Sequence, residues 1–327
     1  MVTKTKKKGE IAVKIVLGVI CALLIAYSLS IILMLAWGVL SSLKSGKDFQ
    51  SNILGLPKIN DPSWIKGKDD PRSSYYQLVQ LKNYADLINN FIHTAKSDFF
   101  TGSAEVHHES DQTVLTMLFN SIFYAFGNGL VQAIFPAVMA YMCAKYPYKF
   151  SKALYILVIV IMTLPIVGAY PSELTLLRNL GLYDTWHGNF IQRCSFLGMY
   201  FLVFYEYFKG MPDTYSEAAE IDGASQLTVM LRIYMPLAAK IIGSVFLIRF
   251  IFFWNDYSSI QLYMPTHFTL AYFIYYLPYY KFPPKGTRAT APMVIASGMM
   301  LALPVIVVYA FLHDKLMGNM TLGGIKG

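Results

Sequence analysis

Charged side chains are scarce in this sequence, at 14% of its 327 residues, whereas a soluble protein carries about 25%. Hydrophobic residues make up 55%, and the mean hydropathy is +0.45. This composition excludes an ordinary soluble domain and indicates an integral membrane protein. The net charge of +8 does not indicate a nucleic-acid partner, because long apolar runs separate the basic residues.

Signatures of catalysis and of metal binding are also missing. There is no phosphate-binding loop of the form Gly-x-x-x-x-Gly-Lys-Ser/Thr, because the run Gly46-Lys47 is followed by Asp48. The run His107-His108-Glu109 lacks the His-Glu-x-x-His spacing of zinc enzymes, so we interpret it as part of a polar loop. The three cysteines show no paired spacing. We therefore predict no catalytic residues, no metal site and no cofactor bound by this chain.

Six apolar runs are long enough to cross a membrane. The predicted spans cover residues 15–43, 114–144, 153–170, 190–208, 237–257 and 292–312. The first run is retained, because it is longer than the apolar part of a signal peptide and no small-residue cleavage site follows it. The lysine-rich residues ahead of it place the N-terminus in the cytoplasm. The predicted fold is therefore all-α, with six transmembrane helices and both termini cytoplasmic.

These spans define the expected domain organisation. A basic cytoplasmic N-terminus, a first span and an extracytoplasmic loop precede a five-span core, and a cytoplasmic tail follows it. In order, these parts are residues 1–14, 15–43, 44–112, 113–312 and 313–327, with a cytoplasmic loop at 209–236 inside the core. We expect helical pieces around residues 80–100, packed on the outer membrane face.

The loop at 209–236 carries the strongest local signals. Thr214 and Glu217 have the spacing of a capping box at a helix start. Gly223 offers the left-handed conformation that ends a helix. Ser225 can cap a second helix, which ends near Pro236. The pattern predicts a short helix, a glycine-centred turn and a second helix that leads into a membrane span.

This loop resembles the signature of the inner-membrane permease subunits of binding-protein-dependent ABC importers. Their pattern is Glu-Ala-Ala, two variable residues and Asp-Gly-Ala, followed by a hydrophobic residue and a proline. The residues that match it are Glu217, Ala218, Ala219, Asp222, Gly223, Ala224, Ile233 and Pro236. In that family the loop is cytoplasmic and docks into a cleft of the ATPase subunit. The resemblance implies that these residues couple the chain to an ATPase; the alternative is an ordinary capped surface helix.

Three further segments are similar to the carbohydrate branch of that family. Residues 180–185 resemble its Leu-Gly-Leu-x-Asn-Thr pattern, with Asp184 in place of asparagine. Residues 321–327 resemble the Thr-x-Gly-x-Val-Lys-Gly ending of maltose-type permeases, and residues 254–257 resemble its Trp-Asn-Asp/Glu-Phe motif. The resemblance implies a type I ABC importer permease fold in the bacterial plasma (inner) membrane. It also implies an oligosaccharide or related carbohydrate as the solute.

The partners follow from the same resemblance. A permease of this kind pairs with a second permease subunit, most often as a heterodimer, with two ATPase subunits that hold ATP and Mg, and with an extracytoplasmic solute-binding protein. Membrane lipid surrounds it. Closure of the ATPase dimer would move the Glu217–Ser225 segment as a lever. Alternatives are an import permease for a peptide, polyamine or anion, an ion-coupled secondary transporter, and a scaffold without transport.

Polar groups inside the predicted spans are candidates for the substrate path, because a charge in a membrane is costly. Arg249 lies near the middle of the fifth span. It faces either an acidic or hydroxyl-rich solute, or a carboxylate or helix end of the partner permease. Asp256 is expected on the same helical face, two turns on. The other candidates could contact a sugar, although packing and hydrogen bonding between helices is the alternative: Trp254, Asn255, Tyr257, Asn120 and Tyr124.

Overall fold

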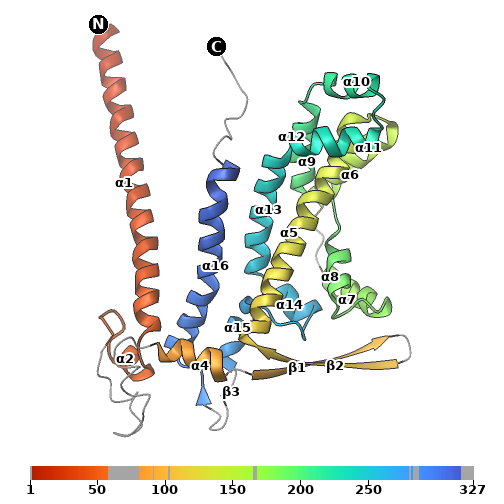
Figure 1. Cartoon of the computed structure of the whole chain (residues 1–327). Helices are drawn as coiled ribbons and strands as arrows, with labels where there is room; N and C mark the ends of the chain where they lie inside the picture. The colour runs from red at the N-terminus through yellow and green to blue at the C-terminus, as the bar shows by residue number, and fades with distance from the viewer. Residues whose placement is uncertain are drawn as a thin grey trace. The chain divides into compact units, whose positions relative to one another are not determined.

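The computed structural model describes residues 2–57, 81–90, 92–101, 104–164, 168–279, 281–282 and 287–317 (Figure 1). The chain divides into two compact units. One comprises residues 1–90 and 278–300, and the other comprises residues 91–277 and 301–327. The carbohydrate-type ending at 321–327 and residues 58–80 of the long loop lie outside the described residues.

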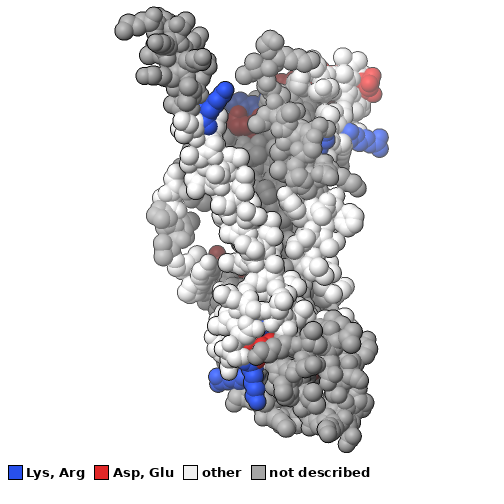
Figure 2. Space-filling model, turned by 90° about the vertical axis from the view of Figure 1, so that its left-hand side faces the viewer, with Lys and Arg blue, Asp and Glu red and all other residues white. Residues whose placement is uncertain are grey.

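The first unit is built around the N-terminal helix α1, Val2–Ser42. Its apolar part, Val13–Ser42, is long enough to cross a membrane, and its side chains are exposed within the chain along most of that length. On the face shown in Figure 2, uncharged side chains form a broad band between charged groups at either end. Lipid or another subunit is the expected neighbour of such a surface.

Short elements complete this unit and close the end of α1. They are α2, Gly46–Ser51, α4, Lys82–Asn90, the paired strands β3, Lys281–Phe282, and β4, Thr287–Arg288, and the start of α16, Ala291–Met317. The last carbonyls of a helix lack helical donors. Here the Asn83 amide donates to the carbonyls of Ser42, at 2.6 Å, and Lys44, at 2.9 Å. The buried Lys44 ammonium donates to the carbonyl of Asn52 at 2.6 Å.

The second unit is built around α5, Val114–Lys145, against which α9, Met199–Lys209, and α13, Ala239–Trp254, pack. Small residues on α5 allow this close approach. A Cβ at Gly129 would lie 3.2 Å from the backbone nitrogen of Phe250 on α13. The fully buried alanines of α5 are Ala125, Ala133, Ala137 and Ala140.

Smaller elements surround these helices. They are α6, Lys149–Thr163, α7, Ala169–Asn179, α8, Trp186–Arg193, α10, Thr214–Ile221, α11, Gln226–Val229, the π-helical segment Met230–Tyr234, α12, Met235–Leu237, α14, Ser258–Tyr263, and α15, Leu270–Tyr276, with a 3-10 turn at Leu277–Tyr279.

The structure confirms a mostly helical fold. Among the described residues three helices are long and apolar enough to cross a membrane, and a bent pair, Gln226–Leu237 with Ala239–Trp254, gives a fourth. The predicted third span is covered only in part, by α6. The predicted continuous fourth span, 190–208, is wrong, because the chain is not helical between Arg193 and Met199.

The long loop contains a β-hairpin that was not predicted. Strand β1, Ile92–Thr101, pairs antiparallel with β2, Ala104–Thr113, in a register that joins Ile92 to Thr113. The expectation of helix around residues 80–100 therefore holds for α4 but is wrong from Ile92 onward. Pairing with a neighbouring strand decides whether such a segment forms a helix or a strand, because strand preference depends strongly on context.

Candidate functional site

The turn predicted at Gly223 is confirmed; it lies in the loop at 209–236, which we call the coupling loop after its predicted role. Gly223 has φ +79°. The amide of Ala224 donates to the carbonyl of Ala219 at 2.9 Å, and the amide of Gly223 donates to that of Glu220 at 3.0 Å. These two bonds form a Schellman motif. A Cβ at Gly223 would meet no atom within 4 Å. The need for glycine here therefore comes from the backbone conformation and not from a lack of space.

The start of α10 differs from the prediction. Thr214 is the first residue of the helix, and Asp213 holds the N-cap position without a side-chain capping bond. The capping box predicted at Thr214 and Glu217 is therefore wrong. The physical reason is a distant contact: the Asp213 carboxylate accepts a hydrogen bond from the Lys145 ammonium at 2.7 Å, which directs it away from the helix start.

The second half of the loop matches the prediction and adds a π-helical turn. The Ser225 hydroxyl caps α11 by accepting from the amide of Thr228 at 3.3 Å. Pro236 has no N–H and cannot donate a helical hydrogen bond. Just before it, the amide of Met235 donates to the carbonyl of Met230, five residues back, which is the π-helical pattern. The helix axis then bends by 70° before α13.

Side chains at the end of α5 hold this loop. Lys145 is 7% exposed and donates to the carbonyl of Met211 at 2.6 Å as well as to Asp213. Within the loop, Tyr234 is fully buried, and its hydroxyl donates to the carbonyl of Pro212 at 3.2 Å. The Tyr146 hydroxyl bonds to Gln226. The loop is therefore tied to α5 as well as continuous with α13.

The outer surface of the loop is available for docking. Among the coupling candidates, two pack against the hydrophobic core, namely Ala219 and Ala224. The exposed ones are Glu217, Ala218, Asp222, Gly223 and Pro236. Ile221, at the end of α10, is 87% exposed. An apolar side chain at the tip of a polar loop is typical of an interaction surface.

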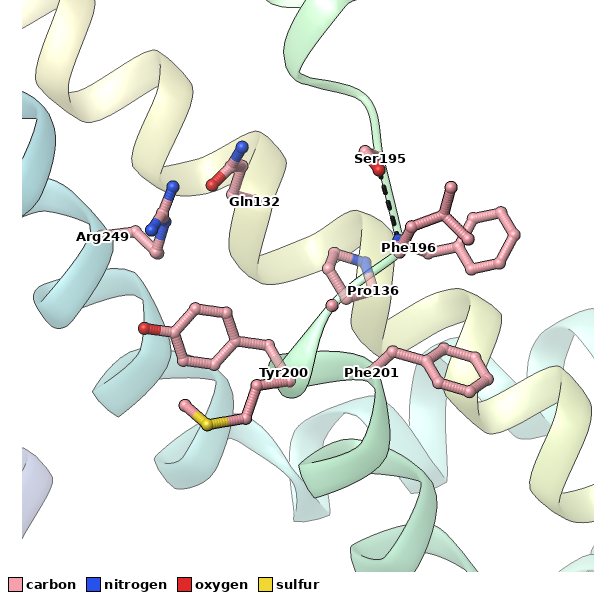
Figure 3. Close-up of a pocket in the computed structure, with 10 residues that line it drawn as sticks. Gln132, Pro136, Ser195, Phe196, Tyr200, Phe201 and Arg249 are labelled. Carbon is pink, nitrogen blue, oxygen red and sulfur yellow. Dashed lines mark hydrogen bonds between the residues drawn. The ribbon is translucent and has the colours of Figure 1, made fainter. Parts of the chain in front are cut away.

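A cavity of about 320 Å³ lies among α5, α9, α13 and the chain before α9. It is lined by Gln132 and Pro136 of α5, by residues 195–201, and by Arg249 of α13 (Figure 3). Residues 194–198 form the non-helical break within the predicted fourth span. Non-helical backbone at membrane depth is tolerated where it lines a cavity, and this is where the break lies.

Arg249 is held in this cavity by aromatic rings. Its guanidinium lies 4.5 Å from the ring centre of Phe252, 4.9 Å from Phe253 and 5.8 Å from Tyr200. Its Nε is buried and has no hydrogen-bond partner within the part of the chain that the structure describes. The ion pairs in that part are Lys145–Asp213, Lys209–Glu206 and His267–Asp184, so none of them includes Arg249.

The candidate Asp256 does not join Arg249. Helix α13 ends at Trp254, so Asp256 lies beyond the helix and the expectation of a shared helical face is wrong. Its carboxylate accepts from the Tyr124 hydroxyl at 3.1 Å, the Ser258 hydroxyl at 3.1 Å and the Ser259 amide at 3.0 Å. These contacts connect α5 to the start of α14.

The remaining candidates contact protein groups rather than the cavity. The buried Trp254 indole donates to the carbonyl of Leu301 at 3.0 Å. Asn255 donates to the carbonyl of Ile251 at 2.8 Å. The Tyr257 ring stacks on Tyr275 at 4.7 Å. Asn120 donates to the carbonyl of Phe268 at 2.9 Å.

The residues before α9 that line the cavity were not predicted. Ser195 and Phe196 belong to a stretch without proline, so the sequence carries no strong break signal there. Ser195 and Gly198 are the weak signal that could have found it, since serine and glycine favour turns. The Ser195 hydroxyl accepts from the amide of Leu197 at 3.2 Å, the bond drawn in Figure 3.

A buried polar network lies in the Leu-Gly-Leu segment. Asp184 has φ +57°, a conformation in which asparagine and aspartate are several-fold enriched among residues other than glycine. Its carboxylate accepts from the Thr266 hydroxyl at 2.8 Å and lies 3.2 Å from the His267 ring nitrogen. In the neighbouring outer segments, Tyr263 donates to Glu173 at 2.6 Å, and burial, followed by this bond, raises the pKa of Tyr263.

These features are those of a helical membrane protein with an exposed loop and a cavity between its helices. A family model described as the binding-protein-dependent transport system inner membrane component matches residues 134–315. The match covers more than half of the chain, so the chain belongs to this family and the predicted resemblance is confirmed. As a member of this family, the chain is a multi-pass protein of the inner membrane.

Individual relatives agree. The chain is 33% identical to the inner membrane ABC transporter permease protein YcjP of Escherichia coli over 158 residues, 45% of this chain and 52% of that protein. It is 26% identical to the arabinooligosaccharides transport system permease protein AraQ of Bacillus subtilis over 212 residues, 64% of this chain and 73% of that protein. The alignment with YcjP thus spans about half of that relative's length.

A solved structure shares the fold. The match is to a chain in the crystal structure of a bacterial ABC transporter involved in the import of the acidic polysaccharide alginate. The TM-score is 0.66 at 20% identity, and the match covers 91% of this chain and 96% of that one. The permease fold implied by the sequence is therefore supported over nearly the whole chain.

Proposed function

We propose that this chain is the permease subunit of an ATP-driven importer for an oligosaccharide or related carbohydrate that an extracytoplasmic binding protein delivers. The observation that carries the proposal is the coupling loop, held rigidly at the end of α5 in a chain of the binding-protein-dependent family. The Leu-Gly-Leu segment and the name of the relative AraQ support a carbohydrate solute.

The energy would come from partners. Two ATPase subunits hold ATP and Mg, and a second permease subunit completes the path. The six-span topology with cytoplasmic termini belongs to this proposal, with the broken fourth span counted as one crossing.

The loop can move both walls of the cavity. Toward the C-terminus it is continuous, through the π-helical turn and the 70° bend, with α13, which carries Arg249. Through Lys145 it is bonded to α5, which carries Gln132. A displacement of α10 by a docked ATPase therefore reaches two cavity walls by different routes.

Uptake by cells that lack this chain and carry it on a plasmid tests the proposal. Uptake of a labelled oligosaccharide should require the chain and cellular ATP, and should persist when an ionophore collapses ion gradients while ATP is maintained. Uptake that follows the ion gradient would instead indicate a secondary transporter. Uptake restricted to peptides, polyamines or inorganic anions would assign a different solute.

A paired substitution tests the loop itself. Ala218 is exposed on α10 and Ala153 is exposed on α6. Ala218→Trp adds bulk to the docking surface and should abolish uptake with the chain still inserted. Ala153→Trp adds the same bulk elsewhere and should leave uptake near the unsubstituted level. Equal effects of the two substitutions would contradict the docking role.

A further inference from the structure

Two arginines meet at one aromatic ring beside the cavity. The Arg193 guanidinium lies 5.4 Å from the ring centre of Phe253, and that of Arg249 lies 4.9 Å from the same centre. Nε and Nη2 of Arg193 and Nε of Arg249 are buried without a hydrogen-bond partner in the described ranges of the chain. An arginine keeps its charge in proteins, so deprotonation cannot relieve the cost of burying these groups.

The carboxylates of the neighbouring elements accept hydrogen bonds from other groups. Asp256 accepts from Tyr124 and from two groups at the start of α14. Glu173 accepts from Tyr263 at 2.6 Å and from Gln192 at 3.3 Å. Neither arginine takes part in an ion pair with a described residue. Neither guanidinium therefore has a carboxylate as its direct partner in the described part of the chain.

The cavity itself presents donors and no acidic side chain. The polar side chains of its described lining are the guanidinium of Arg249, the amide of Gln132 and the hydroxyls of Ser195 and Tyr200, with no aspartate or glutamate. Figure 3 shows the polar ends of Arg249 and Gln132 on the same side of the cavity. Helix α9, which has 11 residues, begins at this lining, and its first amides add partial positive charge.

We propose that this cavity binds an oxyanion, and that in transport the oxyanion is the carboxylate of an acidic saccharide. The inference rests on the proposed function. A guanidinium binds a carboxylate through two parallel, charge-assisted hydrogen bonds. A neutral sugar offers acceptors without the opposite charge, and a cation is repelled. The volume of about 320 Å³ is near the lower end of the range for small-molecule sites. It is therefore large enough for a sugar residue that carries the acidic group, with the rest of the solute along the path.

Protection of a cysteine tests binding without transport. In the assembled complex with Cys21, Cys143 and Cys194 replaced by alanine, Ser195→Cys places a thiol in the cavity lining. Galacturonate should slow its alkylation by a small neutral reagent, and galactose should not. Adding Arg249→Met should weaken the apparent affinity for galacturonate roughly tenfold or more. The protection of the thiol should then be lost. Lack of protection by galacturonate, or equal protection by galactose, would overturn the site.

Inorganic sulfate separates the two sources of the anion. Protection by galacturonate alone supports a saccharide carboxylate. Protection by sulfate as strong as that by galacturonate supports the oxyanion site and overturns its assignment to the saccharide. Lys152→Met removes an exposed charge on α6 and should leave protection unchanged; if it also abolishes protection, net charge alone accounts for the effect and the site is refuted.

Transport distinguishes this inference from the proposed function. ATP-dependent uptake of a galacturonate disaccharide should exceed that of the matching galactose disaccharide in the unsubstituted complex. Arg249→Met should remove this preference, and Arg249→Lys should restore part of it, since lysine keeps the charge without the planar fork. Uptake of galactose disaccharide with no acidic preference overturns the inference alone. Arg249-dependent protection without uptake of any saccharide overturns the proposed function alone.

Discussion

Replacing Gly223 by valine is the sharpest test of the coupling loop. The residue has φ +79° and no atom within 4 Å of the position a Cβ would occupy. A valine there creates no collision with the surroundings. Its effect must come from the backbone, because the left-handed region disfavours side chains with a Cβ, and β-branched ones most.

The cost can be worked out from that conformation. A left-handed residue other than glycine costs roughly 1–2 kcal/mol, which lowers the population of the native turn about 5- to 30-fold. The two hydrogen bonds of the Schellman motif, from Ala224 and Gly223, depend on the same turn. If the turn opens, α10 and α11 lose their fixed angle and the docking surface is no longer presented.

The assay is solute-stimulated ATP hydrolysis by the reconstituted complex, together with its yield. Gly223→Val should give a normal yield with most of the stimulation lost. Gly223→Asn should retain it, since asparagine tolerates the left-handed conformation. Gly168 is a matched control, with φ +83° and open surroundings, and Gly168→Val should remain coupled. Full stimulation in Gly223→Val, or equal loss in Gly168→Val, would refute the reasoning.

Three other predictions address topology, packing and the carboxylate of Asp256. In a cysteine-free background, a cysteine at Ser172 should react with an impermeant thiol reagent from outside and one at Ser216 should not; the reverse would invert the topology. Gly129→Leu should reduce the yield of folded chain, because it pushes α5 from the backbone of α13, whereas Gly18→Leu on the open face of α1 should not; equal yields would contradict the packing. Asp256→Asn should destabilise the chain by about 1–3 kcal/mol in thermal unfolding without raising KM for the solute, and a raised KM with unchanged unfolding would return Asp256 to the substrate path.

Local chemistry explains which parts of the loop could be predicted. The turn at Gly223, the cap at Ser225 and the helix change before Pro236 depend on groups within a few residues of one another. The helix start could not be placed to the residue, because Asp213 and Thr214 are both good caps. The contact that decides between them comes from Lys145, 68 residues away, and no local pattern contains it.

The cavity could not be predicted for the same reason. Phe196 and Leu197 keep the hydropathy of the fourth span high across the break, so the run reads as one helix. The non-helical segment lies around the same cavity as α5 and α13, and this surrounding stabilises the break. Arg249 was identified because a single charge in an apolar run is visible in sequence. Asp256 was misjudged because the helix that carries Arg249 ends at Trp254.

A charged cavity in an importer must also release what it binds. Each 1.4 kcal/mol of lost interaction weakens binding tenfold, and an oxyanion held by both Arg249 and Gln132 loses a donor when the two separate. These residues lie on different helices, which the coupling loop reaches by different routes: through the 70° bend into α13, and through the Lys145 contacts to α5. A loop movement that shifts one helix past the other therefore lowers affinity without removing the charge. Under the proposed function, this gives ATP hydrolysis by the partner subunits a direct route to solute release.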